Sequence, residues 1–429
     1  MTSEPTQGSG PDTGSPAALP TFNPWSDGFA SDPYAQYREL TERNPAQQSV
    51  LGPWMLFRYD DCVRLLRDPS LSVEDASVRG ANPRAELRER VLGDRAARGT
   101  RSMLNIDPPD HTRIRGIVQK VFTPRSIERL GPRVQELVDD ALESAMAQAG
   151  DREPVDLIAR LAFPLPFQVI TEMLGMPEAD RDQLREWSHM LTLGLEPTLA
   201  PLHFDEILAA SDQMTEHVLA AIEWKRDHPA DDLLTALIAA EHEGERLTSD
   251  ELVDQVVLLF VAGHETTVNL IGNGTLALLR NRAELERWRR DPSLGAPAVD
   301  ELLRYDSPVQ FSRRVTTAPV ELAGHAVEPG SFVLVGLAAA NRDPRHWGSD
   351  ADRLLLTRQG AAQHLTFGSG VHHCLGAALA RLEGRIALGT LARRFPDMEA
   401  AVDEPRWSGR LVLRGLEELP VVLGTPGPE

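Results

Sequence analysis

The stretch Phe367-Gly-Ser-Gly-Val-His-His-Cys-Leu-Gly376 decides the interpretation of this chain. Its glycines allow tight backbone turns and a close approach to a bulky planar ligand. A strongly helical sequence, residues 377–385, follows at once, so Cys374 lies at the N-terminus of a helix. Free amide groups and the helix dipole at such a position stabilise a thiolate and lower the pKa of the thiol. The stretch therefore predicts a site that presents an anionic sulfur ligand.

Alternative interpretations of the cysteine stretch are weaker. A zinc site of His372, His373 and Cys374 would need neighbours on one loop to complete a tetrahedron, and the sequence has no second ligand cluster. A dinucleotide-binding loop would need G-x-G-x-x-G between a strand and a helix, which the sequence lacks. The other cysteine, Cys62, lies in the amphipathic segment Tyr59–Arg67, where a buried cysteine is usually inert packing.

A second unusual segment lies in the longest predicted helix. Thr248-Ser-Asp-Glu251 has the spacing of a capping box, and the helix is expected to continue to about Asn281, roughly 50 Å at 1.5 Å per residue. Its middle, Gly263-His-Glu-Thr-Thr267, combines a glycine, hydroxyls and a carboxylate where burial should be greatest. Threonine hydroxyls can bond to the carbonyl one turn earlier, and a buried carboxylate is costly unless it has a use. Taken alone, the segment is best explained as a polar contact between helices.

Composition excludes several classes of protein. The 429 residues carry 44 Lys and Arg against 64 Asp and Glu, a net charge of −20, which argues against binding of polyanions such as nucleic acids. Two cysteines cannot form a disulfide framework, nor supply the four thiolates that an iron–sulfur cluster usually needs. The N-terminus lacks the basic and apolar parts of a signal peptide, and no apolar run reaches the roughly 20 residues of a membrane helix. We therefore expect a cytoplasmic protein that binds neither membranes nor nucleic acids.

The periodicity of the sequence predicts a mainly α-helical protein with small β-sheets. Residues 1–22 are expected to form a disordered leader, residues 23–424 one large domain with the long helix crossing it, and residues 425–429 a tail. Helices are predicted at Ser126–Ala149 and Pro154–Leu174, and strands at Trp54–Tyr59, Val320–Leu322, Phe332–Leu337 and Gly409–Leu413. Two segments broken by Gly and Pro, Ser77–Arg101 and Leu191–Phe204, are expected to be lids over a site or ordinary surface loops.

Four motifs together resemble the cytochrome P-450 superfamily. The cysteine stretch is similar to its haem-binding signature F-G-x-G-x-H/R-x-C-x-G, and the segment that begins at Ala262 is similar to its oxygen-groove pattern A/G-G-x-D/E-T-T/S. Glu301-Leu-Leu-Arg304 matches its E-x-x-R motif, and residues 107–115 match a segment common in its soluble bacterial members. Order and spacing agree from about Asn23 to the end of the chain. The resemblance implies the P-450 fold, a single large domain whose long central helix crosses over the haem.

The resemblance implies roles for residues on both sides of the haem. Cys374 would be the thiolate ligand of the iron, and Phe367 would pack beside the sulfur. Glu265 and Thr266 would relay protons toward dioxygen, because such a relay needs a carboxyl group and a hydroxyl that both donates and accepts. The residues implied to bind haem are Ala262, Phe367, Gly368, Cys374 and Gly376, and those implied to hold its propionates are His111, Arg115, Arg314 and His372.

A structural Glu-Arg-Arg triad is also implied by the resemblance. Glu301 and Arg304, three residues apart on one helix face, would pair with Arg353 and serve folding and haem retention more than turnover. The family often has P-D-R-F at the last arginine, whereas Ala351-Asp-Arg-Leu354 lacks the Pro and the Phe. Arg353 is assigned on the Asp-Arg pair that remains.

The implied activity is that of a haem-thiolate monooxygenase with haem b as cofactor. It would insert one oxygen atom of O2 into a C–H or C=C bond of a hydrophobic small molecule such as a terpene, steroid, fatty acid or polyketide. Because no flavin or iron–sulfur module is visible, electrons would come from NAD(P)H through a separate ferredoxin-type or flavodoxin-type donor and its reductase. Oxidative coupling, desaturation or peroxide-driven oxidation on the same fold is an alternative, as is a non-catalytic haem sensor or carrier. We expect a monomer.

Two further sets of residues are predicted to meet the donor and the substrate. An acidic donor would need a local basic patch on the thiolate side of this acidic protein. The candidates for that patch are Arg113, Lys120, Arg381 and Arg385, whose alternative role is plain solubility. The candidates for the substrate pocket are Leu258, Ala262, Val309, Phe311, Leu411 and Val412.

Overall fold

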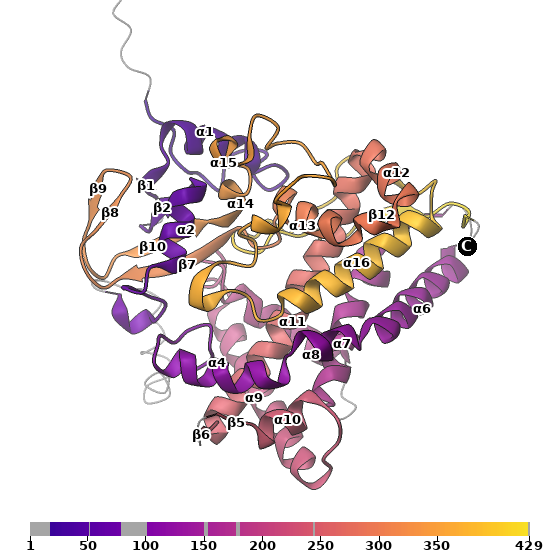
Figure 1. Ribbon diagram of the computed structural model, residues 1–429, viewed down its shortest axis with the longest axis horizontal. Helices are drawn as coiled ribbons and strands as arrows, with labels where there is room; N and C mark the ends of the chain where they lie inside the picture. The colour runs from indigo at the N-terminus through magenta and orange to yellow at the C-terminus, as the bar shows by residue number, and fades with distance from the viewer. Residues whose placement is uncertain are drawn as a thin grey trace, which may run out of the picture.

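The structure is a computed structural model that describes residues 18–50, 52–78, 101–149, 153–176, 181–242 and 245–427. Helices make up most of the molecule, and the largest sheet lies at one side of it, near α1 and α2 (Figure 1). The helices are α1 Tyr34–Arg43, α2 Tyr59–Arg67, α4 Asp110–Val121, α5 Pro124–Glu128, α6 Gly131–Ala149, α7 Pro164–Leu174, α8 Arg181–Leu193, α9 Phe204–Asp227, α10 Leu233–Ala239, α11 Ser249–Arg280, α12 Arg282–Arg290, α13 Gly295–Tyr305, α14 Leu337–Ala340, α15 Pro344–Trp347 and α16 Ala377–Arg394. The strands are β1 Ala46–Gln48, β2 Trp54–Leu56, β3 Leu71–Ser72, β4 Val155–Asp156, β5 Glu241–His242, β6 Glu245–Arg246, β7 Phe311–Thr316, β8 Val320–Leu322, β9 His325–Val327, β10 Phe332–Gly336, β11 Glu399–Ala400 and β12 Pro420–Val422. The predicted mainly α-helical fold with small sheets is confirmed.

The largest sheet positions a basic side chain. Its five strands lie in the order β1-β2-β10-β7-β3, with β10 parallel to β2 and antiparallel to β7. Side chains alternate between two faces. Leu334 packs with the aromatic residues of the N-terminal segment, whereas Val333 and Val335 pack on the side of α2. Arg314 of β7 lies opposite Val333 in the register, so the sheet fixes its place next to α2.

The longest helix, α11, is the central element. Its capping box has the predicted form, because Thr248 Oγ1 accepts the Glu251 N–H at 3.2 Å and Glu251 Oε2 accepts the Thr248 N–H at 2.9 Å. The helix has 32 residues, about 48 Å at 1.5 Å each, and passes behind α16 through the middle of the molecule (Figure 1). Every residue from Thr267 to Leu279 is buried. The prediction of one long helix between Thr248 and Asn281 is confirmed.

Glycines bring α16 close to its neighbours. A Cβ at Gly384 of α16 would lie 2.8 Å from Leu270 Cδ2 of α11, and a Cβ at Gly274 of α11 would lie 3.0 Å from Leu388 Cδ1 of α16. Both distances are too short for a larger residue without movement of the neighbour. The two helices are therefore packed tightly, and the cysteine loop that precedes α16 is held in a fixed position relative to α11.

Two predicted helices are interrupted by prolines. Ser126–Ala149 is divided into α5 and α6, because the ring of Pro132 cannot continue a helix from the preceding turn. Pro154–Leu174 begins as strand β4 and a π-helical turn, and the regular helix α7 starts only at Pro164. Apolar periodicity alone did not reveal these boundaries.

Predicted strands also end early or are absent. The strands predicted at Trp54–Tyr59 and Phe332–Leu337 end earlier, at Leu56 and Gly336, where α2 and α14 follow. The strand predicted at Val320–Leu322 is confirmed as β8. Gly409–Leu413 is not a strand. Buried Glu196 accepts the backbone N–H groups of residues 411, 412 and 413 at 2.7, 2.9 and 2.9 Å, which satisfies them without a partner strand. Leu413 forms only an isolated antiparallel bridge, with Val309.

The chain ends differ from the prediction of a leader and a tail. Residues 1–17 of the predicted leader 1–22 lie outside the described residues. Phe22 is fully buried and packs edge-on against Phe29 at 5.7 Å between ring centroids, so it belongs to the folded domain and not to a leader. At the other end, the Gly427 N–H donates to the Arg394 carbonyl at the end of α16 at 2.8 Å, so this residue of the predicted tail 425–429 packs there, while residues 428–429 lie outside the described residues.

Of the two predicted lids, one is described by the structure. Residues 79–100 of the segment Ser77–Arg101 lie outside the described residues. The segment Leu191–Phe204 includes the end of α8 and the connection to α9, and Glu196 in its middle binds the C-terminal loop 411–413. This connection is therefore hydrogen-bonded to the loop at residues 411–413, far along the chain, and sequence analysis did not predict this contact.

Candidate functional site

The cysteine loop is built from local backbone geometry. The Cys374 N–H donates to the Phe367 carbonyl at 2.9 Å and closes the loop. Gly368 and Gly370 have φ angles of 70° and 76°, a region that favours glycine. A Cβ at Gly370 would also lie 2.7 Å from the Leu66 carbonyl oxygen of α2. Gly376, by contrast, has an ordinary φ of −81° and precedes the first turn of α16.

The Cys374 thiol lies where the sequence predicts, but its pKa does not move as predicted. The backbone N–H groups of Gly376 and Ala377 hydrogen-bond to the sulfur, and the positive charges of Arg115 and Arg381 also lower the pKa. Desolvation by the surrounding protein atoms nevertheless outweighs these effects and raises the pKa of Cys374 above its usual value, although the side chain is still exposed. The predicted net lowering by the helix N-terminus is therefore wrong for the protein alone.

Basic side chains from three elements converge beside this loop. The rings of His111, on α4, and His372, on the loop, lie 4.2 Å apart between centroids. Arg115, one turn after His111, donates through Nη2 to the His373 carbonyl at 2.7 Å. Arg314 of β7 is 4% exposed, and its guanidinium donates to the backbone carbonyls of Leu66 and its own neighbour, Arg313. The four side chains predicted to bind propionates thus gather at one place.

The electrostatics of this basic cluster, which comprises His111, Arg115, Arg314 and His372, favour a bound anion. Burial, followed by the charges of His111, Arg314 and Arg115, lowers the pKa of His372 to about 3. Burial lowers the pKa of Arg314 to about 10. Both His111 ring nitrogens are buried without a hydrogen-bond partner, and no described carboxylate forms an ion pair with Arg314. Asp107, the acidic group near Arg314, already accepts the Val73 N–H at 2.9 Å.

The middle of α11 presents small and polar groups. Ala262 is exposed although it lies halfway along a mostly buried helix, so it faces accessible space. The Thr266 hydroxyl donates to the Ala262 carbonyl at 3.4 Å, the back-bond to the preceding turn that the sequence suggested. Glu265 Oε1 lies 2.9 Å from Nη1 of Arg410, whose side chain is 5% exposed. Arg410 also contacts Thr192 and His189 of α8, and sequence analysis did not single it out.

The Glu-Arg pair of the E-x-x-R motif has a different third member from the one predicted. Glu301 and Arg304 are fully buried and joined by two hydrogen bonds of 2.7 and 2.9 Å. Arg358 donates from Nε to Glu301 Oε1 at 3.1 Å. Arg353 is exposed and contributes only its carbonyl, which accepts from Arg304 at 2.9 Å. The assignment of Arg353 to the triad is therefore wrong, because its side chain points away from Glu301.

Two predicted pocket residues lie in the core instead. Phe311 and Leu411 are each 3% exposed and belong to the aromatic cluster around Phe22. Their side chains pack inside that cluster and have almost no accessible surface, so the prediction that they line a pocket is wrong. Leu258, Val309 and Val412 are partly buried, and Ala262 is exposed, as residues beside a pocket would be.

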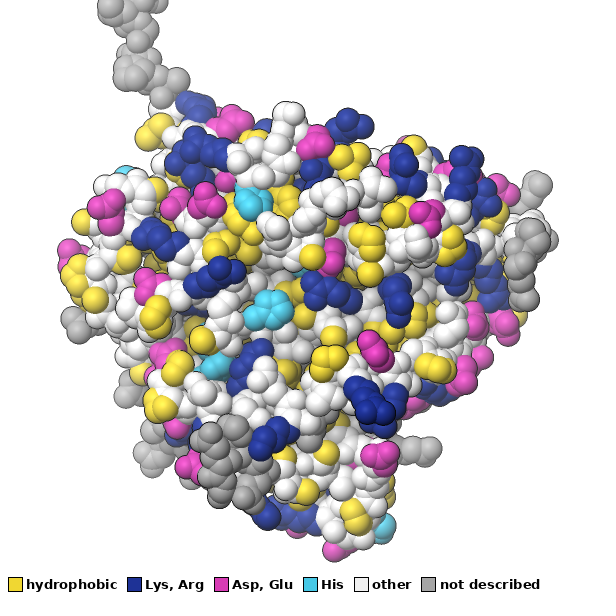
Figure 2. All heavy atoms as spheres, viewed as in Figure 1, with side chains coloured by type: hydrophobic (Ala, Val, Ile, Leu, Met, Phe, Trp, Pro, Cys, Tyr) yellow, Lys and Arg dark blue, Asp and Glu magenta, His cyan; other side chains and the backbone are white. Residues whose placement is uncertain are grey.

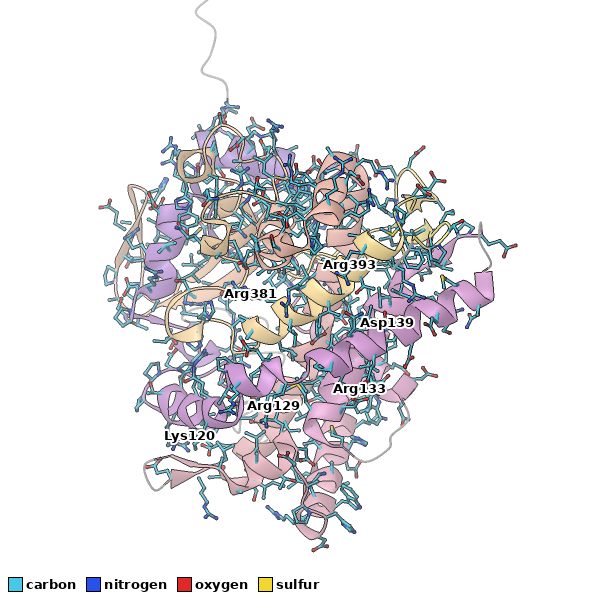
Figure 3. All side chains as sticks on the ribbon, turned by 45° about the vertical axis from the view of Figure 1, so that its right-hand side comes forward. Lys120, Arg129, Arg133, Asp139, Arg381 and Arg393 are labelled. Atoms are coloured by element: carbon cyan, nitrogen blue, oxygen red, sulfur yellow. The ribbon has the colours of Figure 1, made fainter. Side chains whose placement is uncertain are left out.

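The face that carries α16 and α4 is rich in basic side chains. Lys and Arg are spread widely across it, whereas Asp and Glu gather mostly toward its rim (Figure 2). Arg381 lies beside the cysteine loop, with Lys120 on the neighbouring helix α4 (Figure 3). Arg113 is paired with Glu251 and, at 3.3 Å, with Glu245, so it is tied to the start of α11. Arg385 is exposed.

Comparison with known proteins identifies the family. The family model "Cytochrome P-450" matches residues 54–291 and 296–406. The chain belongs to the cytochrome P-450 family. It is 42% identical to cytochrome P-450 107B1 of Saccharopolyspora erythraea over 94% of this chain and 98% of that protein. It is 40% identical to the vitamin D(3) 25-hydroxylase of Pseudonocardia autotrophica over 93% and 96% of the two chains.

A solved structure shares the fold. The polyketide synthase cytochrome P-450 PksS of Bacillus subtilis superposes with a TM-score of 0.83 and 35% identity, covering 94% of this chain and all of that one. The chain is thus a P-450 monooxygenase, an oxidoreductase of a haem-thiolate family that uses O2. None of the helices among the described residues is both long and apolar enough to cross a bilayer.

The residues of this P-450 fit a haem group. The partnerless nitrogens of His111 and the buried charge of Arg314 suit the two anionic propionates of haem. Gly370 lets the loop approach the backbone of α2 closely, which holds the loop in place beside these groups. The cysteine sulfur receives two backbone N–H groups, which is the support that a metal-bound thiolate needs.

Proposed function

We propose that Cys374 is the thiolate ligand of haem b and that the basic cluster beside it holds the two propionates. The basic cluster carries this proposal, because two arginines and two histidines converge on one place, both His111 nitrogens lack a partner, and no described carboxylate forms an ion pair with Arg314. His111 and Arg115 would bind from α4, Arg314 from β7, and His372 from the loop. Phe367, Gly368 and Gly376 would shape the loop around the sulfur, and Ala262 would contact the opposite side of the haem.

The groups on α11 are proposed to manage protons. When bound, haem supplies the activation of O2 and the insertion of one oxygen atom into a substrate bond. The Thr266 hydroxyl would hold a proton near that oxygen, since it can both donate and accept. Glu265 would pass protons to Thr266 from the side of α8. Its carboxylate is paired with Arg410 at 2.9 Å, so delivery would require this ion pair to open.

The proposed substrate is a hydrophobic small molecule of the steroid or polyketide type. Leu258, Ala262, Val309 and Val412 supply apolar surface around the middle of α11, which suits such a molecule. The similarity to a vitamin D(3) 25-hydroxylase and to a polyketide P-450 supports both classes. Glu265 and Arg410 add one polar place to an otherwise apolar surface.

The proposed electron source is NAD(P)H, acting through a reductase and a ferredoxin-type or flavodoxin-type protein in the cytoplasm. Such donors are typically acidic, and the basic face around α16 and α4 would attract them. Lys120, Arg381 and Arg385 are the proposed contacts. Arg113 is left out of this set, because two glutamates already neutralise it.

The experiment that tests the proposal is a carbon monoxide difference spectrum of the reduced, purified protein. We expect the strongly red-shifted Soret band that is diagnostic of a thiolate ligand. Cys374→Ser should lose this band, whereas Cys62→Ala should keep it, because Cys62 is buried between α2 and the sheet. A wild-type preparation that contains haem but lacks the band would refute the proposal.

A further inference from the structure

An ion pair that the proposed chemistry does not use lies next to the cysteine loop, between α13 and the start of α16. Asp300 of α13 accepts a hydrogen bond from Arg381 Nε at 2.7 Å. The guanidinium carbon of Arg381 lies 4.7 Å from the centre of the Phe367 ring, within the range of a cation–π contact. The carbonyl of Phe367 in turn accepts the Cys374 N–H. Arg381 is thus held against the loop that carries the sulfur, near the start of α16 (Figure 3).

The neighbouring histidine does not share the charge of Asp300. His364 Nδ1 accepts the Thr366 N–H at 3.2 Å, so its proton is on Nε2, which lies 3.4 Å from Asp300 Oδ1. Burial lowers the pKa of His364, so the ring is neutral at neutral pH. Among the described side chains, Arg381 is therefore the cation that balances Asp300, which is itself only 9% exposed.

The charge of Arg381 reaches the sulfur. Arg381 is one of two cations that stabilise the ionised form of Cys374, the other being Arg115, which donates to the His373 carbonyl. Asp300 contacts Arg381 and carries the opposite charge. The two charges therefore act in opposite directions on any charge at the sulfur.

We propose that the Asp300–Arg381 pair sets the reduction potential of the iron bound at Cys374. Arg381 raises the potential through its positive charge, and Asp300 positions Arg381 and offsets part of that charge. The inference rests on the proposed haem ligation. One-electron reduction of ferric to ferrous iron adds one negative charge to the site, so a fixed positive charge nearby favours it and a negative charge opposes it. Removal of either member alone should therefore shift the potential in opposite directions.

The test is an equilibrium redox titration of the haem-loaded protein with small-molecule mediators and dithionite, without a protein donor. Arg381→Gln should lower the potential and Asp300→Asn should raise it. The double variant should lie between the two single variants, because the net charge of the pair is restored. Arg381→Lys should shift the potential least of the Arg381 variants, since it keeps the charge. Arg393→Gln is the matched control, because its exposed side chain lies on the same helix about three turns further along and should leave the potential unchanged.

These results separate the proposal from its alternatives. If Arg381 only docks the donor, Arg381→Gln will slow reduction by a donor protein and leave the potential unchanged, which overturns the proposal. If the pair only stabilises the fold, both variants will melt earlier with no shift of opposite sign, which also overturns it. Because Arg381 is about one-third exposed, its variants should fold even where Asp300→Asn does not. Loss of the red-shifted carbon monoxide band in the wild type would refute the haem ligation itself, whereas a normal band with unshifted potentials refutes this inference alone.

Discussion

Arg358→Ala is the most informative single change for the stability of the fold. The Arg358 side chain is 7% exposed and bonds to Glu301 Oε1 at 3.1 Å and to Asp350 Oδ1 at 2.9 Å. It also donates to the Asp350 carbonyl at 2.8 Å. Its removal breaks a buried charge network with Glu301 and Asp350. Arg304 remains on Glu301, so the carboxylate is left with one arginine instead of two.

The expected loss follows from this geometry. Breaking a buried ion pair by removing one partner costs about 3 to 5 kcal/mol, and the surviving Arg304 contact favours the lower value. Unfolding entropy of roughly 2.1 cal/mol/K per residue over about 400 residues gives ~0.8 kcal/mol/K, so ~3 kcal/mol corresponds to a fall in Tm of about 4 °C. Arg353→Ala should cost less than about 0.5 kcal/mol, because that side chain is exposed and its bond to Arg304 uses the backbone.

The assay is differential scanning calorimetry of both variants, with the haem content of each preparation measured in parallel. Arg358→Ala should melt earlier and bind less haem, and Arg353→Ala should match the wild type. An equal or larger loss in Arg353→Ala would refute the assignment of Arg358 to the triad and restore the sequence-based one.

Three other changes have expected outcomes of their own. Thr266→Ala should keep haem but divert reducing equivalents to hydrogen peroxide, because the proposed proton-holding hydroxyl is lost; full coupling of NAD(P)H to product would count against the relay. Glu196→Gln leaves one acceptor oxygen for three buried N–H groups, so we expect a loss of about 2 kcal/mol and faster hydrogen exchange at residues 411–413. Unchanged hydrogen exchange at residues 411–413 would contradict this role of Glu196. The pKa of His372 is lowered to about 3 by burial and neighbouring cations, so the folded haem-free protein keeps this ring neutral while the unfolded chain protonates it below about 6.5. The stability is fully present above that pH and falls with acidification by at most about 1.4 kcal/mol per unit, less for a partly exposed ring. Urea unfolding of haem-free His372→Gln should show a smaller loss between pH 6.5 and 5, and an equal loss would contradict this reasoning.

Features encoded by neighbouring residues could be predicted from sequence. The capping box at Thr248, the extent of α11 and the turn at the cysteine loop depend on contacts within a few residues. The same holds for the back-bond of Thr266 to the preceding turn. Local spacing also placed His111 and Arg115 on one face of α4. In each case the residue pattern and the structure involve the same few positions, so the pattern is sufficient.

Features that depend on the surroundings of a side chain in the folded protein were predicted wrongly. These are the direction of the pKa shift of Cys374 and the locations of two apolar side chains. The helix N-terminus was expected to lower the pKa of Cys374, yet desolvation raises it, and the extent of burial cannot be read from the loop itself. Phe311 and Leu411 looked like apolar pocket residues, but the aromatic cluster around Phe22 uses their side chains. A local pattern does not show which of two apolar surroundings a side chain will enter.

By itself, the amino-acid sequence determined the ligand loop, the long helix and the family, because each is written in short runs of adjacent residues. Only the tertiary structure decided the partners of the charged groups. Glu265 meets Arg410 across 145 residues, and Glu196 meets the loop at Leu411 across 215. Arg353 and Arg358 are five residues apart and chemically identical, and the packing around Glu301 alone selects between them. Such ion pairs form because folding brings two distant charges together away from water. The residues next to each charge in the sequence do not identify its partner.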